Sequence, residues 1–210
     1  EALRRHGLDI TIMTSDILSP DQPHAEAQLR VATELGIPQY RLGFYRYDLN
    51  RSVLKQLAEI QPAVNDLATF NGELGIQGIY QNHSGASFVG APIWDVHLLL
   101  RVIPVTQIGV AFDIRHATIE GGLAWPLHYD LMRPHLGAIY AKDYQWDGRK
   151  AQHVPLGTGR VDPKFFTMVR ESGYTGPYSL HVEYLPHASA AENYDALKRD
   201  LKQLHEWLAA

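Results

Sequence analysis

The chain has no cysteine among its 210 residues. This absence excludes a disulfide scaffold, a thiol nucleophile and any zinc or iron–sulfur centre with cysteine ligands. The chain also lacks an apolar run of the ~20 residues that a membrane helix needs. Its 19 basic and 23 acidic residues give a formal net charge of −4, and no segment is rich in Lys or Arg. Such a chain has no positive field for a nucleic acid backbone or an anionic membrane, so we expect neither as a partner.

The residues that are present are typical of an ordinary globular domain. Hydrophobic residues make up 45% of the chain and charged residues 20%, which is enough apolar surface to form a core. No repeat, low-complexity stretch or linker interrupts residues 1–210, and we expect a single domain. The chain begins at Glu1 and no charged-then-apolar leader follows. We expect a cytoplasmic protein, and leave open that an N-terminal signal is missing.

Six apolar segments of strand length recur about every 30 to 40 residues, each bounded by turn residues. They cover residues 9–14, 39–45, 75–83, 107–113, 136–143 and 177–184. Segments with helical spacing lie between and after them, at 23–35, 51–74 with a break at Pro62, 94–103, 162–171 and 190–207. Strands that alternate with helices predict an α/β fold with a parallel sheet and helices outside it.

Polar side chains gather where the predicted strands end. Side chains alternate between the two faces of a strand. Each predicted strand after the first therefore places at least one polar side chain on the same face of the sheet. The set is Arg41, Gln81, His83, Asp113, Lys142, His181 and Glu183. The carboxyl ends of parallel strands share one edge, where such folds carry their functional groups. We therefore predict a functional site there. The alternative is a structural network of ion pairs among Arg41, Lys142, Asp113 and Glu183.

Five motifs in order suggest a family. They are IYQNHSG at 79–85, FDIRH at 112–116, YAKD at 140–143, LGTGRVD at 156–162 and GPYSLHVEY at 176–184. In this order they resemble the xylose isomerase-like TIM-barrel superfamily, the sugar phosphate isomerase/epimerase group. The resemblance covers residues 10–184. It implies a (β/α)₈ barrel with a divalent metal at the strand ends, held through Glu, Asp, His and Glu.

The chain has fewer strands than that barrel. A (β/α)₈ barrel has eight strands and typically ~250 residues, whereas six βα units are predicted here. The segment ending at Thr14 aligns with the third strand of the family, so we expect the first two strands to be missing. Six parallel strands cannot close, and the edges at 9–14 and 177–184 would stay unpaired. We expect either a fragment or a homo-oligomer in which another copy covers those edges.

The resemblance assigns roles to particular residues. Asp113 and His116 match the aspartate and the substrate-facing histidine of the D-x-x-H motif, and Glu183 matches the glutamate of the last strand. Lys142 matches the lysine of H-x-K-D. Two positions depart from the pattern, because Gln81 stands where the family has glutamate and Tyr140 where it has histidine. The implied cofactor is a divalent metal (Mg, Mn or Zn) on Asp113, Glu183 and Gln81, bound weakly or not at all.

The function that follows is that of a sugar or keto-sugar isomerase or epimerase. Such an enzyme moves a proton α to a carbonyl with divalent-metal assistance, and its partner is a small carbohydrate. We expect Glu183, His116 and Lys142 to be catalytic. We expect Arg41, His83, Trp146 and His181 to bind substrate. Since Gln81 is not a carboxylate, Glu183 is the single candidate base. A one-base dehydratase or lyase on a keto-sugar and a non-catalytic sugar-binding pseudoenzyme are the alternatives.

Other motifs favour structural roles. The LGTGR segment at 156–160 lacks the Lys-Ser/Thr ending of a phosphate loop, and we interpret it as a turn before a helix. Cleavage of abasic DNA at a three-zinc site would need further histidines and acids at strand ends and a basic surface. Six further histidines, His153 among them, have no partner at ligand spacing, and we expect them on the surface or in loops.

Overall fold

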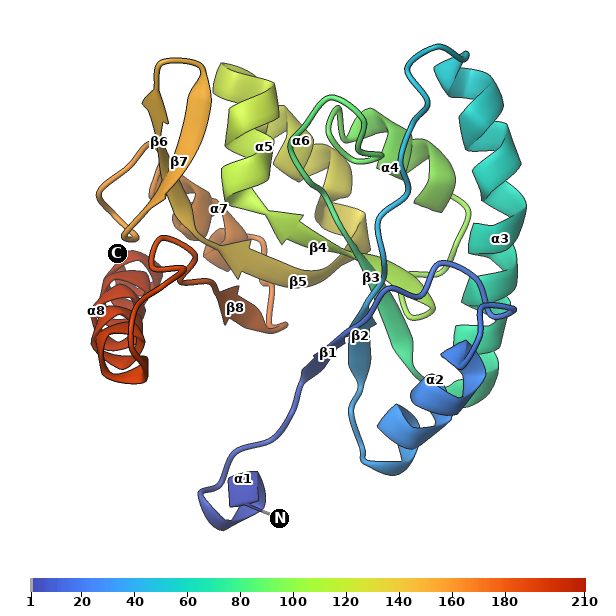
Figure 1. Ribbon diagram of the computed structural model, residues 1–210, viewed down its shortest axis with the longest axis horizontal. Coiled ribbons are helices and arrows are strands. Elements are labelled where there is room, and N and C mark those ends of the chain that lie inside the picture. The colour runs from blue at the N-terminus through green and yellow to red at the C-terminus, as the bar shows by residue number, and fades with distance from the viewer. Residues whose placement is uncertain (1) are drawn as a thin grey trace.

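The computed structural model describes residues 2–210, and its centre is a sheet of six parallel strands (Figure 1). The strands are β1 (Ile12–Thr14), β2 (Gln39–Arg41), β3 (Gln77–Gln81), β4 (Ile108–Asp113), β5 (Leu136–Ala141) and β8 (Tyr178–Leu180). They lie in the order β1-β2-β3-β4-β5-β8, and each pair of neighbours is parallel. Every strand falls inside a predicted segment. The fold is α/β, part of a TIM barrel, as predicted.

The sheet does not close into a full barrel. Within residues 2–210, β1 and β8 each pair with one neighbour, β2 and β5 respectively, and not with each other. The view in Figure 1 shows the open side between β1 and β8, below the sheet. A six-stranded parallel half-barrel therefore carries two unpaired edges, as the strand count predicted.

Helices flank the strands on the outer side of the sheet, except for the short α1 (Ala2–Arg5), which lies apart from the sheet (Figure 1). The others are α2 (Ala25–Glu34), α3 (Val53–Leu74), α4 (Trp94–Leu100), α5 (Ile114–Gly121), α6 (Trp125–Met132), α7 (Lys164–Glu171) and α8 (Ala190–Ala209), with 3₁₀ turns η1 (Gly122–Ala124) and η2 (Arg133–His135). The break expected at Pro62 is absent from α3. Burial of Leu57, Val64 and Leu67 on both sides of Pro62 offsets the lost hydrogen bond. Within residues 2–210 no helix is both long and apolar enough to span a membrane.

The sequence missed two helices and a hairpin after β4 and β5. Helices α5 and α6 were not predicted, because Asp113 ends β4 and caps α5 at once, which leaves no turn to mark the start. The antiparallel hairpin of β6 (Asp143–Asp147) and β7 (Lys150–Val154) was also missed. Its signal was the pair Asp147-Gly148, where Gly148 has the positive φ of 58° that a tight hairpin turn needs.

Two apolar clusters lie on opposite faces of the sheet. The larger one packs strand residues such as Tyr80 and Phe112 against the helices. The smaller one faces the barrel interior and contains Ile79, Ala111, Ala138 and Tyr140, with Ile12 packed against it. Ile79 and Ala111 thus face the interior and Tyr80 faces the helices, as side-chain alternation along a strand requires. The small interior cluster leaves the carboxyl ends of the strands to polar side chains.

Candidate active site

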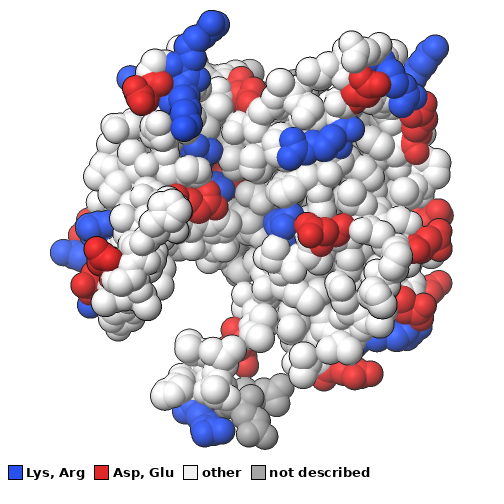
Figure 2. Space-filling model, viewed as in Figure 1, with Lys and Arg blue, Asp and Glu red and all other residues white. Residues whose placement is uncertain are grey.

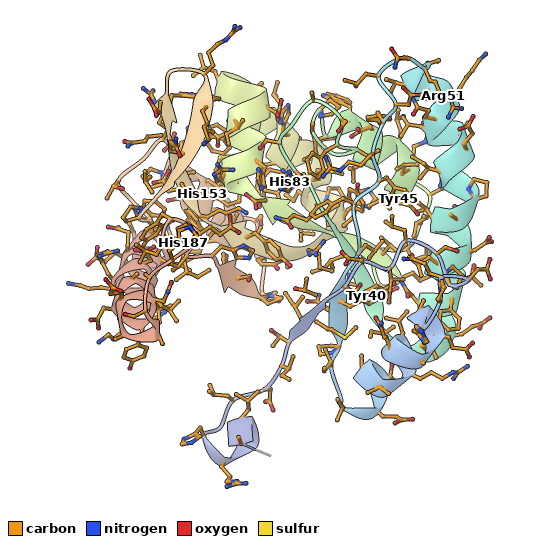
Figure 3. All side chains as sticks on the ribbon, in the orientation of Figure 1. Tyr40, Tyr45, Arg51, His83, His153 and His187 are labelled. Carbon is orange, nitrogen blue, oxygen red and sulfur yellow. The ribbon has the colours of Figure 1, made fainter. Side chains whose placement is uncertain are left out.

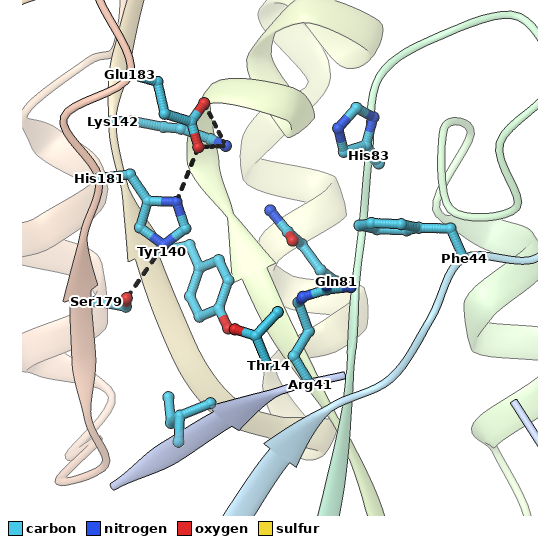
Figure 4. Close-up of a pocket in the computed structure, with 11 residues that line it drawn as sticks. Thr14, Arg41, Phe44, Gln81, His83, Tyr140, Lys142, Ser179, His181 and Glu183 are labelled. Atoms are coloured by element: carbon cyan, nitrogen blue, oxygen red, sulfur yellow. Dashed lines mark hydrogen bonds and ion pairs between the residues drawn. The ribbon is translucent and has the colours of Figure 1, made fainter. Parts of the chain in front are cut away.

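A cavity of about 340 Å³ opens at the carboxyl ends of the strands (Figure 4). It is lined by Ile12, Thr14, Arg41, Phe44, Gln81, His83, Tyr140, Lys142, Ser179, His181 and Glu183. These residues come from, or directly follow, every strand of the main sheet apart from β4. Strand β4 contributes Asp113, which contacts the lining residues Gln81 and Lys142 from a fully buried position.

Asp113 is held on every side by donors. Its Oδ1 atom accepts the backbone N–H of His116 at 3.1 Å and so caps α5. Its Oδ2 atom accepts Nε2 of Gln81 at 2.8 Å and lies 3.1 Å from Nζ of Lys142. Burial opposes ionisation, but the neighbouring His116 and Lys142 outweigh it and hold the pKa of Asp113 well below its usual range. Asp113 is therefore a permanent anion beneath the cavity.

Lys142 joins Asp113 to Glu183. It follows β5 directly and is only 4% exposed. Its Nζ atom lies 3.2 Å from both carboxylate oxygens of Glu183, in addition to Asp113. Figure 4 shows the ammonium beside Glu183 at the wall of the cavity. One ammonium thus links the carboxylates that follow β4 and β8, and Asp113 and Glu183 share a single site.

Glu183 is the carboxylate that faces the cavity. Its Oε1 atom lies 3.1 Å from Nδ1 of His181, whose Nε2 is 3.1 Å from the Ser179 hydroxyl. Its side chain is 40% exposed. Burial opposes ionisation, but hydrogen bonding from His181 and the charge of Lys142 outweigh it and lower the pKa of Glu183 to about 2. Glu183 is an ionised acceptor at neutral pH.

His83 lines the other wall of the cavity, and His116 packs behind it with its ring tilted by 32°. The rings of His83 and His116 have centroids 4.0 Å apart. His83 faces the cavity opposite Glu183 (Figure 4), and its Nδ1 lies 2.8 Å from the carbonyl oxygen of Ser84. Since a carbonyl only accepts, Nδ1 donates, and the other nitrogen of the neutral ring carries a lone pair. Burial lowers the pKa of His83 and favours this neutral form.

His116 lies behind the cavity and is 3% exposed. Its Nδ1 is 2.8 Å from the Ser84 hydroxyl and its Nε2 is 3.5 Å from Oδ2 of Asp113. Burial lowers the pKa of His116 to about 3, so the ring is neutral at pH 7. Placed behind Asp113 and against His83, it supports these two residues and does not line the cavity.

The structure brings most of the predicted site residues together. Arg41, Gln81, His83, Lys142, His181 and Glu183 line one cavity, with Asp113 beneath it. Trp146 does not line it: this residue lies on β6 and borders a separate hollow with Thr158 and Arg160. The alternative, a structural network of ion pairs that includes Arg41, is present only in part. Lys142, Asp113 and Glu183 do pair, but Arg41 lies over the ring of Phe44 at 4.7 Å.

Sequence reasoning missed two basic residues. His153 was expected on the surface or in a loop, but β7 carries its Nδ1 to 3.3 Å from Oε2 of Glu183 (Figure 3). No spacing signalled this contact, because the hairpin itself was not predicted. Arg115 follows Asp113 by two residues and is 4% exposed. It donates to the carbonyl of Ala151 at 3.2 Å and is attracted by both Asp113 and Glu183.

Asp143 fixes the loop that follows the hairpin. Its carboxylate accepts backbone N–H groups from Tyr144, Gly157, Gly159, Arg160 and Val161 at 2.8–3.1 Å. These donors are already satisfied, so the LGTGR segment is a turn and no phosphate cradle, as predicted. Asp143 also anchors the chain directly after Lys142. This anchoring holds the ammonium in the site.

The donor set does not fit the divalent metal that the resemblance implies. Gln81 turns its Nε2 donor toward Asp113, and burial raises the pKa of Tyr140 to about 12, which keeps its hydroxyl neutral. Neutral phenols are poor ligands for hard cations. Lys142 stands between the two remaining carboxylates. Within residues 2–210 no group of three or more His, Cys, Asp or Glu side chains is arranged to hold a metal ion.

On the face shown in Figure 2, basic and acidic side chains are interspersed, and no continuous basic patch covers it. The open side between the N-terminal segment and α8 is visible as a deep notch in the lower part of the same view.

Comparison with known proteins agrees with this geometry. A family model described as "Xylose isomerase-like TIM barrel" matches residues 1–209. The comparison with curated proteins gives no match.

Three solved structures share the fold. One is the probable 3-DHS dehydratase AsbF of petrobactin synthesis from Bacillus anthracis (TM-score 0.72, 16% identity, 96% of this chain and 78% of that one). Another is the 3-keto-D-glucoside 4-epimerase YcjR from E. coli (TM-score 0.70, 16% identity, 96% and 82%). A third is a xylose isomerase-like TIM barrel protein from Mycobacterium smegmatis in complex with magnesium (TM-score 0.65, 16% identity, 98% and 76%). At these identities the likeness shows the fold.

Proposed function

The chain belongs to the xylose isomerase-like TIM barrel family, and we propose that it is an enzyme that isomerises a sugar or keto-sugar by moving the proton α to its carbonyl. The observation that carries the proposal is the pair Glu183 and His83. An ionised carboxylate and a neutral imidazole face each other across one cavity, with the ammonium of Lys142 beside the carboxylate. These are the groups that such a proton transfer needs.

Glu183 moves the proton bound to carbon. Its carboxylate accepts the α proton, and the electron pair of the broken C–H bond moves toward the carbonyl oxygen. The substrate thereby becomes an enediolate, with negative charge on that oxygen. The pKa of about 2 makes Glu183 a weak base. The adjacent ammonium of Lys142 offsets this weakness, because it stabilises negative charge on the enediolate oxygen. Glu183 then returns the proton to the neighbouring carbon.

His83 moves the proton bound to oxygen. The lone pair on its ring takes the proton of the hydroxyl next to the carbonyl, and the ring returns that proton to the former carbonyl oxygen. Together the two transfers exchange carbonyl and hydroxyl positions with no net gain or loss of atoms. A second carbon base is not needed, which agrees with the amide of Gln81 in place of a carboxylate. Metal assistance plays no part in these steps.

The cavity supports a ligand the size of a monosaccharide. Its volume of about 340 Å³ lies at the lower end of the range for small-molecule sites. Arg41, Gln81 and His181 offer donors and acceptors to hydroxyl groups, and the ring of Phe44 offers an apolar face. The lining is richer in polar than in apolar side chains, as a carbohydrate requires.

The test is proton exchange in deuterated water. The protein is incubated with a panel of aldoses, ketoses and 3-keto-sugars, and the α-proton signal is followed by proton NMR. We expect exchange with at least one sugar and a loss of roughly 100-fold or more in Glu183→Gln, as for removal of a general base. Glu171→Gln, on the exposed end of α7, is the matched control. Absence of exchange with every sugar would leave the sugar-binding pseudoenzyme, and unchanged exchange in Glu183→Gln would assign another base.

A dehydratase on a keto-sugar is the second candidate. One observation favours it: the site supports a single carbon base, Glu183, which is enough to remove a proton before a β-hydroxyl leaves as water. A conjugated enone would then accumulate and absorb in the ultraviolet. An absorbance rise that accompanies α-proton loss, with no isomeric sugar formed, would identify the dehydratase.

A further inference from the structure

Four ions at and beneath the cavity wall balance one another without a metal. Asp113 and Glu183 supply two negative charges, and Lys142 and Arg115 supply two positive charges. Asp113 is fully buried, and Lys142 and Arg115 are each 4% exposed. His116 is neutral at pH 7, since burial lowers its pKa to about 3. The cluster is therefore close to neutral as it stands.

A divalent ion added to this cluster would leave two positive charges in excess. The desolvation of such an ion is repaid only by close opposite charges and satisfied ligands. Here the ion would stand beside the ammonium of Lys142, which already lies 3.1 Å from Asp113 and 3.2 Å from Glu183. Repulsion between the two cations weakens metal binding, and here the two lost ligands at Gln81 and Tyr140 leave too little attraction to offset it.

Both oxygens of the Asp113 carboxylate are also already engaged by protein donors. Oδ1 accepts the backbone N–H of His116, and Oδ2 accepts from Gln81 and contacts Lys142. Gln81 acts as a donor to an anion, which is the opposite of a metal ligand's role. Tyr140 adds a neutral hydroxyl. The charges, the contacts of Asp113 and the types of side chain present thus all oppose a divalent metal at this site.

We propose that this site works without a metal, because Gln81 and Tyr140 stand where the family pattern has two metal ligands, and that the ammonium of Lys142 alone supplies the positive charge beside the reacting oxygen. The proposal rests on the proposed function for the reaction that the ammonium supports, since it assigns to Lys142 the stabilisation of the enediolate oxygen. Weak metal binding is a property of the residues at the site, and a metal titration measures it independently of any reaction with sugar.

The experiment is a Mn²⁺ titration followed by electron paramagnetic resonance, on protein stripped with EDTA. It compares wild type, the double variant Gln81→Glu/Tyr140→His, and the triple variant that adds Lys142→Met. We expect a wild-type Kd above ~1 mM, and binding at least about 100-fold tighter in the triple variant, where a carboxylate and an imidazole are restored and the ammonium is gone. The double variant should bind at least about tenfold more weakly than the triple, because Lys142 still repels the ion.

Stoichiometric wild-type binding of Mn²⁺ with a Kd below ~10 μM would overturn the proposal, as would a triple variant that binds no better than wild type. Circular dichroism melts verify that the variants fold. If the triple variant is unfolded, the wild-type titration decides alone. Sugar exchange by wild type in EDTA is a separate arm. Failure of all exchange together with a weak wild-type Mn²⁺ site would reject the proposed reaction and leave the metal-free cluster intact.

Discussion

The Nζ atom of Lys142 lies 3.1 Å from Oδ2 of Asp113, and both side chains are withdrawn from solvent. Lys142 follows β5 and Asp113 ends the neighbouring strand β4, so the contact joins the ends of these two strands beneath the cavity. It fixes the position of the ammonium relative to Glu183. The same pair therefore carries both stability and the proposed chemistry.

Removing the ammonium should destabilise the fold. In Lys142→Met a buried carboxylate loses its charged partner, which costs about 3–5 kcal/mol of unfolding free energy. Urea denaturation followed by circular dichroism measures the change. The double variant Lys142→Met/Asp113→Asn should recover part of this loss, since the unpaired charge is removed. A double variant less stable than Lys142→Met would contradict the ion-pair account.

The loop at residues 156–161 should depend on the charge of Asp143. In Asp143→Asn, several charge-assisted bonds to backbone N–H groups weaken, and we expect a loss of about 1–3 kcal/mol in unfolding free energy. Asp162→Asn is the matched control, because Asp162 accepts one N–H, from Lys164, in an exposed position. Asparagine caps a helix about as well as aspartate, so this control should change stability by less than ~0.5 kcal/mol.

Stability should fall as the pH drops below 6.5, partly because of His116. Its pKa is about 3 in the folded protein, against 6.5 for an ordinary histidine. Between these values the unfolded chain binds more protons, so unfolding is favoured as pH falls, with a limiting slope of about 1.4 kcal/mol per pH unit. Urea midpoints at pH 7, 6 and 5 measure the slope.

The variant His116→Asn should flatten that slope, whereas His205→Asn, on the exposed face of α8, should leave it unchanged. The pH is kept at 5 or above because the lowered pKa values of Asp113 and Glu183 add a further loss of stability at more acidic pH. Equal slopes in wild type and His116→Asn would show that another group titrates.

The roles of His83 and Glu183 should be separable by experiment, because His83 moves a proton bound to oxygen and Glu183 moves a proton bound to carbon. In His83→Asn we expect conversion between isomeric sugars to fall by roughly 100-fold, because the hydroxyl proton loses its carrier. Exchange of the α proton with deuterium should fall much less, since Glu183 remains. Proton NMR records both rates in one sample. Equal losses of both rates would indicate that His83 acts on the carbon proton as well.

Much of the architecture was predictable from local patterns. All six strands of the main sheet lie in predicted segments, and side-chain alternation correctly faced Gln81 and His83 toward the interior. These features depend on neighbours two to four residues apart. The elements that failed, α5 and the hairpin, follow β4 and β5 with no turn residue between, so local spacing had no boundary to detect.

The sequence by itself determined the parallel α/β fold and the set of polar groups at the strand ends, since strand period and strand order fix both. Only the tertiary structure decided which cation meets the two carboxylates. Lys142 and Asp113 are distant in sequence, and β7 alone carries His153 to Glu183. The strength of these ion pairs depends on distances between side chains of different strands, and the packing of the strands sets those distances.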